Sequence, residues 1–224
     1  MITRHFHSTR GCLSYLTYDE ASKEGALIDP SNEIALEHYV QTLEQEGVTL
    51  KYIIETHTHA DHVSSLPELK EVSPGVRSVR HIASPSKTAD IYIEKDVTEL
   101  PLGASFLTVM YTPGHTNESI SIYNGHEVFT GDTLLIGGTG RTDFQVGNSE
   151  DLYESIHEKL AELPHDTIVR PGHNYQNKHS SVLLDELHTS ERLCMCKDAF
   201  ITYMNAYHPQ KPELFELSLE KNSR

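Results

Sequence analysis

The sequence predicts an α/β protein in which helices cover the sheets. Two observations carry this prediction: short apolar or alternating stretches recur along the chain, and amphipathic stretches with helical spacing lie among them. The chain has 224 residues, which is typical of one large globular domain, and no repeat, low-complexity linker or clear boundary divides it. We therefore expect a single domain over residues 1–224. Residues 181–224 would form C-terminal helices and a charged tail that frays from Glu213.

The predicted strands are short stretches of apolar or alternating residues. Between two of them lies Asn124-Gly125, a pair that favours the tight turn of a β-hairpin. The predicted set is Leu13–Tyr18, Ala26–Ile28, Tyr52–Ile54, Val79–Ala83, Phe106–Tyr111, Ser119–Tyr123, Glu127–Phe129 and Thr167–Val169.

The predicted helices have apolar residues on one face. In the first helix the apolar residues recur at positions i, i+3, i+4 and i+7, and Gly47 follows as a C-cap. In the second helix a leucine and isoleucine stripe ends at Pro164, and Asn148 or Ser149 can cap the start. The predicted set is Glu33–Glu46, Glu150–Leu163, Ser181–Leu193 and Asp198–Tyr207.

Charge and cysteine content exclude several classes of protein. The formal net charge is −15, so neither nucleic acid nor an anionic membrane is an expected partner. No apolar run reaches the roughly 18 residues of a membrane span, and the first residues lack the apolar region of a signal peptide. Because Cys12, Cys194 and Cys196 form no C-x-x-C motif, we expect no disulfide framework and no thiolate zinc site. A reducing, cytoplasmic compartment follows.

Histidines cluster directly after the predicted strand Tyr52–Ile54. The segment Thr56–His62 contains His57, His59, Asp61 and His62. In an extended chain His57 and His59 point the same way, and a following helical turn would direct Asp61 and His62 toward a neighbouring point. This segment therefore predicts metal binding rather than a solvated polar loop.

Three further segments have the same layout, in which an apolar strand is followed by a glycine and a ligand-type residue. These pairs are Gly114-His115, Gly131-Asp132 and Gly172-His173. Glycine allows a sharp turn or a close approach at a strand end, where binding sites of α/β proteins collect. Together with the histidine cluster they predict a metal centre.

The donors are imidazole and carboxylate groups, which suit zinc, iron or manganese. In one arrangement two metals share the site, with Asp132 as the bridging ligand. His57, His59 and His115 would hold the first ion, and Asp61, His62 and His173 the second. In the other arrangement two histidines and one carboxylate form a facial triad that leaves positions open for substrate and oxygen. Spacing alone leaves both arrangements open.

The segments Thr56–His62, Gly114-His115, Gly131-Asp132 and Gly172-His173 stand in the order of the metallo-β-lactamase superfamily, which the sequence resembles over most of its length. The resemblance implies an αβ/βα sandwich, two sheets flanked by helices, with metal at one edge. Two branches of the superfamily compete: glyoxalase II, a dinuclear hydrolase of glutathione thioesters, and the persulfide dioxygenase, or ethylmalonic-encephalopathy-protein-like, branch.

The persulfide dioxygenase branch is the more similar one. Its signature resembles Thr130–Ile136, Gly140–Gln145 and Leu27–Pro30. Only 51 residues follow His173 in the sequence (224 − 173), where glyoxalase II proteins typically carry a larger helical domain. Three residues depart from the pattern. Thr58 and Thr139 stand where many members have cysteine, and Asn174 stands where the branch often has aspartate.

This branch implies oxidation of glutathione persulfide by O2 to sulfite and glutathione at one Fe(2+) per chain, and a homodimer. By position, His57, His115 and Asp132 would hold the iron. The remaining donors would surround it, with Asp61 and His62 as the candidate catalytic residues for orienting a ligand or moving a proton. Those remaining donors are His59, Asp61, His62 and His173.

Arg141 and Tyr175 are the candidate substrate-binding residues. An acidic protein needs a local positive charge to accept the carboxylates of glutathione, and the fork of Arg141 suits a carboxylate, although pairing with Asp143 is the alternative. Tyr175 could donate its hydroxyl to the peptide, or only pack in a loop, and Lys178 is a weaker candidate.

Two other functions remain as alternatives. A glyoxalase II-type hydrolase would hold two Zn(2+) ions and use a metal-bound hydroxide. A metal-holding or sulfur-carrier-binding scaffold is disfavoured, because a scaffold has no need of open metal positions.

Overall fold

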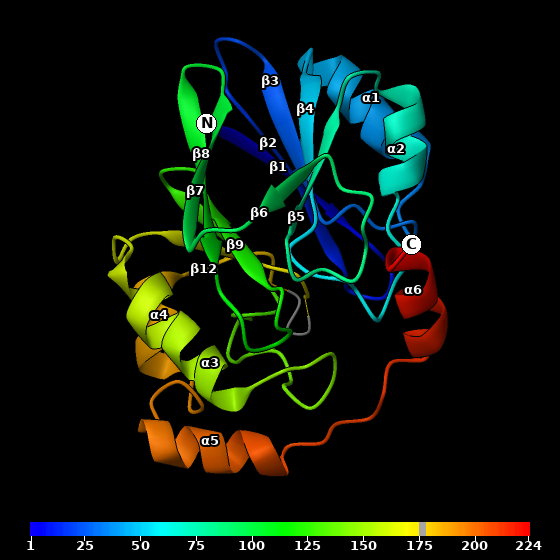
Figure 1. Cartoon of the computed structure of the whole chain (residues 1–224). Helices are drawn as coiled ribbons and strands as arrows, with labels where there is room; N and C mark the ends of the chain where they lie inside the picture. The colour runs from blue at the N-terminus through cyan, green and yellow to red at the C-terminus, as the bar shows by residue number, and fades with distance from the viewer. Residues whose placement is uncertain (175–177) are drawn as a thin grey trace.

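The computed structural model describes residues 1–174 and 178–224 and contains two mixed six-stranded sheets (Figure 1). The first sheet has the order β1-β2-β3-β4-β5-β6 and the second the order β12-β11-β10-β9-β8-β7. The strands of the first sheet are β1 (Ile2–His7), β2 (Leu13–Tyr18), β3 (Glu24–Ile28), β4 (Thr49–Ile54), β5 (Arg77–His81) and β6 (Ile91–Ile93). Those of the second sheet are β7 (Val97–Leu102), β8 (Ser105–Tyr111), β9 (Ile120–Tyr123), β10 (Glu127–Gly131), β11 (Ile168–Pro171) and β12 (Ser181–Val182).

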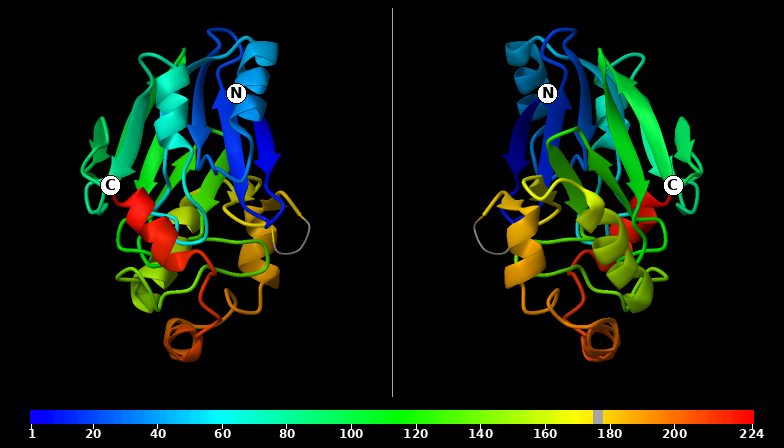
Figure 2. Two further views of the ribbon diagram at one scale, coloured as in Figure 1. Left: turned by 90° about the vertical axis from the view of Figure 1, so that its right-hand side faces the viewer. Right: turned by 90° about the vertical axis from the view of Figure 1, so that its left-hand side faces the viewer.

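Helices cover the outer faces of both sheets, which confirms the predicted αβ/βα sandwich (Figure 1). On the first sheet these are α1 (Leu36–Glu46) and α2 (Leu66–Val72). On the second they are α3 (Ser149–Glu154), α4 (Leu183–Thr189) and α5 (Lys197–Ala206), with a π-helical turn η1 (Ser155–Lys159) and a 3-10 turn η2 (Leu160–Glu162) after α3. The last helix, α6 (Phe215–Asn222), returns to the side of the first sheet (Figure 2).

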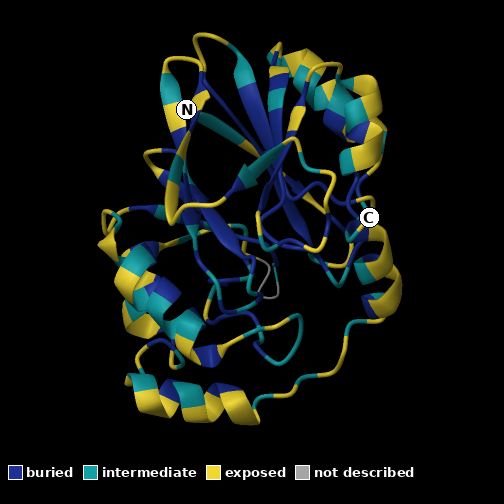
Figure 3. Ribbon diagram, in the orientation of Figure 1, coloured by how far each residue is buried: buried dark blue, intermediate teal, exposed yellow. Residues whose placement is uncertain are grey.

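Alternation along the strands builds the core in separate layers. In β2, Leu13 and Tyr15 point between the two sheets, whereas Leu16 and Tyr18 point toward α1 and α2. A third apolar layer joins the second sheet to α3, α4 and α5 and includes Phe200. The strands are therefore mostly buried, while the outer faces of the helices are exposed (Figure 3).

Several predicted elements differ in extent from the observed ones. The helix predicted over Glu33–Glu46 begins at Leu36. The one predicted over Glu150–Leu163 is α-helical only in α3 and continues as the π-helical η1 and the 3-10 helical η2. The prediction of one helix over Ser181–Leu193 is wrong at both ends. Its first two residues pair with β11 as β12, and Ser190 adopts extended backbone that ends α4.

The predicted fraying of the tail from Glu213 is also wrong. The tail contains α6, and the buried side chain of Asn222 fixes this helix to the loop that follows β4. The Nδ2 group of Asn222 donates to the carbonyls of His59 and His62, both at 2.8 Å, and its Oδ1 accepts from the amide of Ser64 at 2.9 Å. The C-terminus thus supports the histidine segment.

The carboxyl ends of β4, β8, β10 and β11 meet at one edge of the sandwich. Backbone hydrogen bonds hold the two sheets together there, from Ile120 N to Thr56 O at 2.9 Å and from Leu13 N to Gly172 O at 2.9 Å. In the part of the chain that the structure describes, no helix is both long and apolar enough to cross a membrane.

Candidate metal centre

The predicted ligand residues all lie at this edge, and glycines let them approach one another. Gly131 has φ +50°, and a Cβ at this position would collide with Thr56, which precedes His57. A Cβ at Gly172 would lie 2.6 Å from Asp132 Oδ1. The glycine-plus-ligand pattern therefore reflects close backbone approach at the strand ends.

His57, His115 and Asp132 form a compact group in which one ligand atom of each lies within 4.8 Å of the others. His115 Nδ1 donates to the carbonyl of Arg141 at 2.7 Å, and this assigns Nε2 as the lone-pair nitrogen. His57 Nδ1 lies 3.0 Å from Thr56 Oγ1, whose hydroxyl donates to Asp29 at 2.7 Å, so the same assignment follows. Both histidines are therefore oriented as metal-bound histidines normally are.

The charge states of this group also suit a metal. Burial, together with the neighbouring His59 and His115, lowers the pKa of His57 well below its ordinary value, so its imidazole is neutral. Burial alone would raise the pKa of Asp132, but the neighbouring histidines, chiefly His173 and then His115 and His57, together hold that pKa well below the usual range. Neutral imidazole and ionised carboxylate are the forms that bind a cation.

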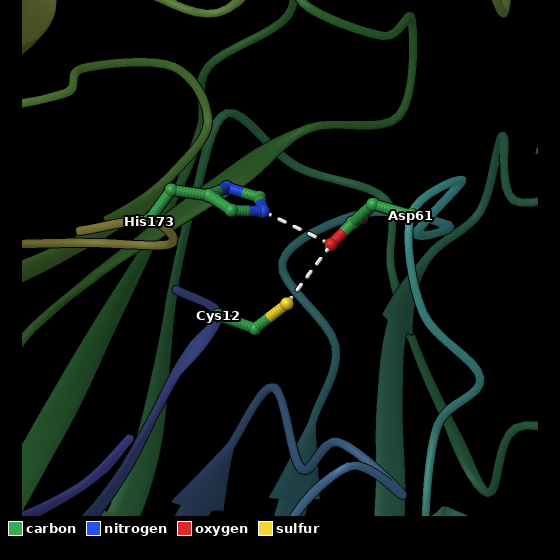
Figure 4. A group of neighbouring side chains, drawn as sticks. All are labelled: Cys12, Asp61 and His173. Atoms are coloured by element: carbon green, nitrogen blue, oxygen red, sulfur yellow. Dashed lines mark hydrogen bonds and ion pairs between the residues drawn. The ribbon is translucent and has the colours of Figure 1, made fainter. Parts of the chain in front are cut away.

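A second group centres on Asp61. Its Oδ2 atom lies 2.9 Å from His173 Nε2 and 3.2 Å from the thiol of Cys12 (Figure 4). The same atom lies 3.0 Å from His62 Nδ1. Burial opposes the charged forms, but Asp61 raises the pKa of His62, and Asp132 and Asp61 raise that of His173, both well above the ordinary value. The carboxylates of Asp61 and Asp132 thus favour the protonated, positively charged forms of these two histidines.

The two groups are neighbours. His173 Nδ1 lies 2.7 Å from Asp132 Oδ1, so Asp132 takes part in both groups. His59 is buried between them and two carboxylates, with its Nε2 at 3.1 Å from Asp29 Oδ1 and 3.5 Å from Glu55 Oε2. Neither ring nitrogen of His59 makes a hydrogen bond among the described residues, although both are buried.

A cavity of about 370 Å³ opens onto both groups. Its metal side is lined by His57, Asp61, His115, Asp132 and His173. Its outer wall is largely apolar and aromatic, and this wall includes Leu135, Thr139, Arg141, Phe144, Gln145, Tyr207, Pro209, Gln210, Pro212 and Phe215. A cavity of this size and character is typical of a small-molecule site.

Arg141 lines the cavity and is paired with Asp143 at the same time. Its Nε and Nη2 atoms lie 2.5 Å and 2.7 Å from the two carboxylate oxygens of Asp143, and its Nη1 donates to Gln210 O at 3.0 Å. The hydrogen bond from Arg141 lowers the pKa of Asp143 to about 2. Both interpretations of Arg141 are therefore compatible with its position. The predicted contact of Tyr175 lies outside the described residues, and Lys178 is exposed.

The sequence analysis missed several residues near the metal groups. Cys12 comes from the start of β2, far along the chain from Asp61, and only tertiary structure brings the two together. Gln145 donates from Nε2 to the carbonyl of Thr58 at 2.6 Å and lines the cavity. Gln145 belongs to the Gly140–Gln145 segment, whose resemblance to the persulfide dioxygenase signature could have identified it as a site residue. No sequence pattern around Asn222 indicated that it would contact the histidine segment.

Comparison with known proteins gives a consistent result. The model of the metallo-beta-lactamase superfamily matches residues 8–173. The bovine protein named "Persulfide dioxygenase ETHE1, mitochondrial" is 35% identical over 100% of this chain and 88% of its own, and its human counterpart is 34% identical. The cytoplasmic hydroxyacylglutathione hydrolase of Arabidopsis thaliana is 32% identical over 74% of this chain and 65% of its own.

Solved structures support the same placement. The crystal structure of ETHE1 from Myxococcus xanthus has a TM-score of 0.94, is 33% identical, and covers 100% of this chain and 98% of its own. A metallo-beta-lactamase structure from Staphylococcus aureus, with a TM-score of 0.88 and 24% identity over 99% of this chain and 72% of its own, shares the fold. The chain belongs to the metallo-β-lactamase superfamily and, within it, to the ETHE1 persulfide dioxygenase branch.

Proposed function

We propose that this protein is a mononuclear iron persulfide dioxygenase that oxidises glutathione persulfide with O2 to sulfite and glutathione. The observation that carries the proposal is the extent of the likeness. The persulfide dioxygenases match the chain over its full length, including α5 and α6, whereas the Arabidopsis hydrolase matches 74% of it. The elements after His173 complete the wall of the cavity, through Tyr207, Pro209 and Phe215.

His57, His115 and Asp132 would hold the iron. Two neutral imidazoles and one carboxylate suit ferrous iron and leave coordination positions open. When bound, the iron supplies the electrons that dioxygen chemistry requires. With one carboxylate the site carries a net charge of −1 before the metal binds, so a divalent ion leaves a positive charge that attracts a persulfide anion.

Asp61 and His62 would move protons. One persulfide, one O2 and one water give one glutathione, one sulfite dianion and two protons, so protons must leave the site. Asp61 lies at the cavity wall and contacts His62 and His173 at 3.0 Å and 2.9 Å. These contacts form a continuous chain of groups that exchange protons easily, which general acid–base transfer needs.

Arg141 would attract a carboxylate of glutathione, and Tyr175 would contact its peptide. Arg141 remains at the cavity wall while it is paired with Asp143. Its orientation is fixed by the hydrogen bonds to Asp143 and Gln210 and by the ring of Phe144, whose centroid lies 4.0 Å from the guanidinium carbon. An arginine fixed in this way loses little side-chain entropy on binding a carboxylate. The homodimer and the cytoplasmic location stay predictions.

A second candidate function is the hydrolysis of glutathione thioesters at two Zn(2+) ions. The observation that favours it is the second group, Asp61, His62 and His173, adjacent to Asp132. Two zinc ions in these groups would activate a water for attack on a carbonyl.

The two functions predict different reactions. We would measure oxygen uptake and sulfite with glutathione persulfide, and thiol release with S-lactoylglutathione, on protein purified without oxygen. The dioxygenase proposal expects one sulfite per O2 consumed and no thioester hydrolysis above the background. Thioester hydrolysis with no oxygen uptake would refute it.

A further inference from the structure

Arg80 is a charged residue on a buried strand. It lies in β5, where Val79 points between the two sheets, so alternation places Arg80 and Ser78 on the opposite face, toward α2 and α6 (Figure 1). Only 7% of Arg80 is exposed. Burial of a charge is costly unless a counter-charge accompanies it, so the partner of this guanidinium is the question that its position raises.

The protein supplies no counter-charge to Arg80. Its Nη1 atom donates to the carbonyl of Asn222 at 3.0 Å. Within residues 1–174 and 178–224 Arg80 forms no ion pair, and its Nε and Nη2 groups have no hydrogen-bond partner. Asp90, an acid on the same side of the sheet, is already engaged with Ser78 Oγ at 2.7 Å and Lys70 Nζ at 2.6 Å. A buried positive charge with free N–H donors therefore remains.

A second cavity, of about 180 Å³, adjoins Arg80. Its wall shares no residue with the cavity at the metal groups. Three cationic residues line it, Arg80, Lys221 and Arg224, against one acidic residue, Glu68. The volume is below the roughly 300–1,000 Å³ of pockets that hold organic ligands, so the cavity suits a small ion.

We propose that this cavity is a binding site for a small inorganic oxyanion, phosphate or sulfate, with Arg80 as its main contact. The free N–H groups of an arginine fork can donate to two oxygens of such an anion. Lys221 forms no contact with another charged group among the described residues and reaches the cavity from the exposed side. In a protein with a net charge of −15, such a local excess of cations attracts an anion.

Other groups at the cavity do not take the place of this anion. Glu68 is exposed and forms no ion pair in the part of the chain that the structure describes. The main-chain oxygen of Arg224 accepts from the hydroxyls of Ser86 and Thr88, at 2.8 Å and 3.2 Å, so neutral donors satisfy it. The side chain of Glu68 would repel a bound anion, whereas that of Lys221 would attract it.

An anion on Arg80 would strengthen the link between β5 and α6. Arg80 contacts the carbonyl of Asn222, and Asn222 Nδ2 donates to the carbonyls of His59 and His62 at 2.8 Å. A ligand that binds only the folded chain raises its stability, so the anion should raise the Tm. This inference goes beyond the proposed function and does not depend on it, because binding is measured without turnover.

The test is isothermal titration calorimetry of iron-loaded protein without oxygen, at constant ionic strength set with sodium chloride. Sodium phosphate and sodium sulfate are titrated separately and then in competition, which shows which of the two anions the site prefers. We expect one saturable site per chain at Arg80 and a higher Tm at saturation. Arg80→Gln should weaken binding by roughly 10- to 150-fold through loss of a charge-assisted contact, and Arg80→Lys should recover part of it.

Two exposed substitutions decide the matter even where Arg80→Gln does not fold. Lys221→Ala should weaken anion binding by up to about 5-fold and Glu68→Gln should strengthen it by a similar factor, the range of an exposed charge pair. Lys95→Ala and Glu71→Gln are the matched controls, since both residues are exposed and neither lines the cavity.

Absence of saturable binding, or the same affinity in Arg80→Gln as in the unaltered protein, would overturn the proposal. So would Lys221→Ala and Glu68→Gln that both match their controls. Binding that persists unchanged in all these variants would place the anion at the metal groups instead.

Discussion

Replacement of Asn222 by alanine tests whether the C-terminal helix supports the histidine segment. Asn222 is buried and makes three hydrogen bonds of 2.8–2.9 Å to the backbone of His59, His62 and Ser64. A hydrogen bond contributes roughly 0.5–1.5 kcal/mol net, so the loss of three costs about 3 kcal/mol. In a chain of this size about 1 kcal/mol corresponds to roughly 2–4 °C in Tm, which gives a decrease of roughly 6–12 °C.

The assay is a thermal unfolding curve of iron-loaded protein, followed by the rate at which a chelator removes the iron. The variant should lose iron faster, because the segment that carries the iron ligand His57 loses its attachment to α6 at His59 and His62. Lys221→Ala is the matched control, since Lys221 is the exposed neighbour on the same helix. A Tm within about 1 °C of the control, with unchanged iron loss, would refute the reasoning.

Four further substitutions are informative. Asp132→Ala should remove bound iron and activity together, because this carboxylate lies in both metal groups. His59→Ala should keep most of the iron, since the triad does not include this residue. Arg141→Ala should lower kcat/KM for glutathione persulfide by roughly 10- to 150-fold, because a charge-assisted contact to a carboxylate contributes roughly 1.5–3 kcal/mol. Gly172→Ala should weaken iron binding, because its Cβ would lie 2.6 Å from Asp132 Oδ1.

Each of these variants has a control or a contradicting outcome. Metal analysis of Asp132→Ala that finds unchanged iron would exclude both metal arrangements, and near-complete metal loss in His59→Ala would favour the dinuclear one. Arg141→Lys should recover part of the lost activity and keep the iron, since it keeps the charge without the fork. If Arg141→Ala loses as much activity on a small persulfide as on glutathione persulfide, and its Tm is lower, then Arg141 stabilises the loop through Asp143 and does not bind glutathione. Gly138→Ala is the control for glycine replacement, because Gly138 does not have the left-handed backbone that favours glycine and a Cβ there would meet only side-chain atoms of Arg192, at 3.9 Å.

Local patterns predicted strands in both sheets. The strand predicted over Leu13–Tyr18 has the observed bounds of β2, and the strand predicted over Ser119–Tyr123 differs from β9 by one residue. These strands are buried on both faces or nearly so, and their apolar character is visible in the sequence. The ligand residues His115, Asp132 and His173 could be predicted in the same way, because each follows an apolar strand and a glycine in the sequence.

Other elements gave no local signal because they depend on distant partners. β1 is largely exposed and polar, and it is a strand because β2 pairs with it along its whole length. α6 is held by Asn222, whose partner His62 is 160 positions away in sequence. Cys12, which precedes β2, meets Asp61, which follows β4, only in the folded chain, where Cys12 also forms an isolated bridge with His173. Such contacts follow from topology, and periodicity within one segment does not contain them.

The most direct test of the one-iron account is a titration of metal-free protein with ferrous iron without oxygen, in which the initial rate of oxygen uptake on glutathione persulfide is measured at each step. The account predicts that the rate rises linearly and stops rising at one iron per chain. It also predicts that Asp132→Ala stays inactive throughout. A plateau at two metal ions per chain, or activity that requires zinc and appears only as thioester hydrolysis, would contradict it.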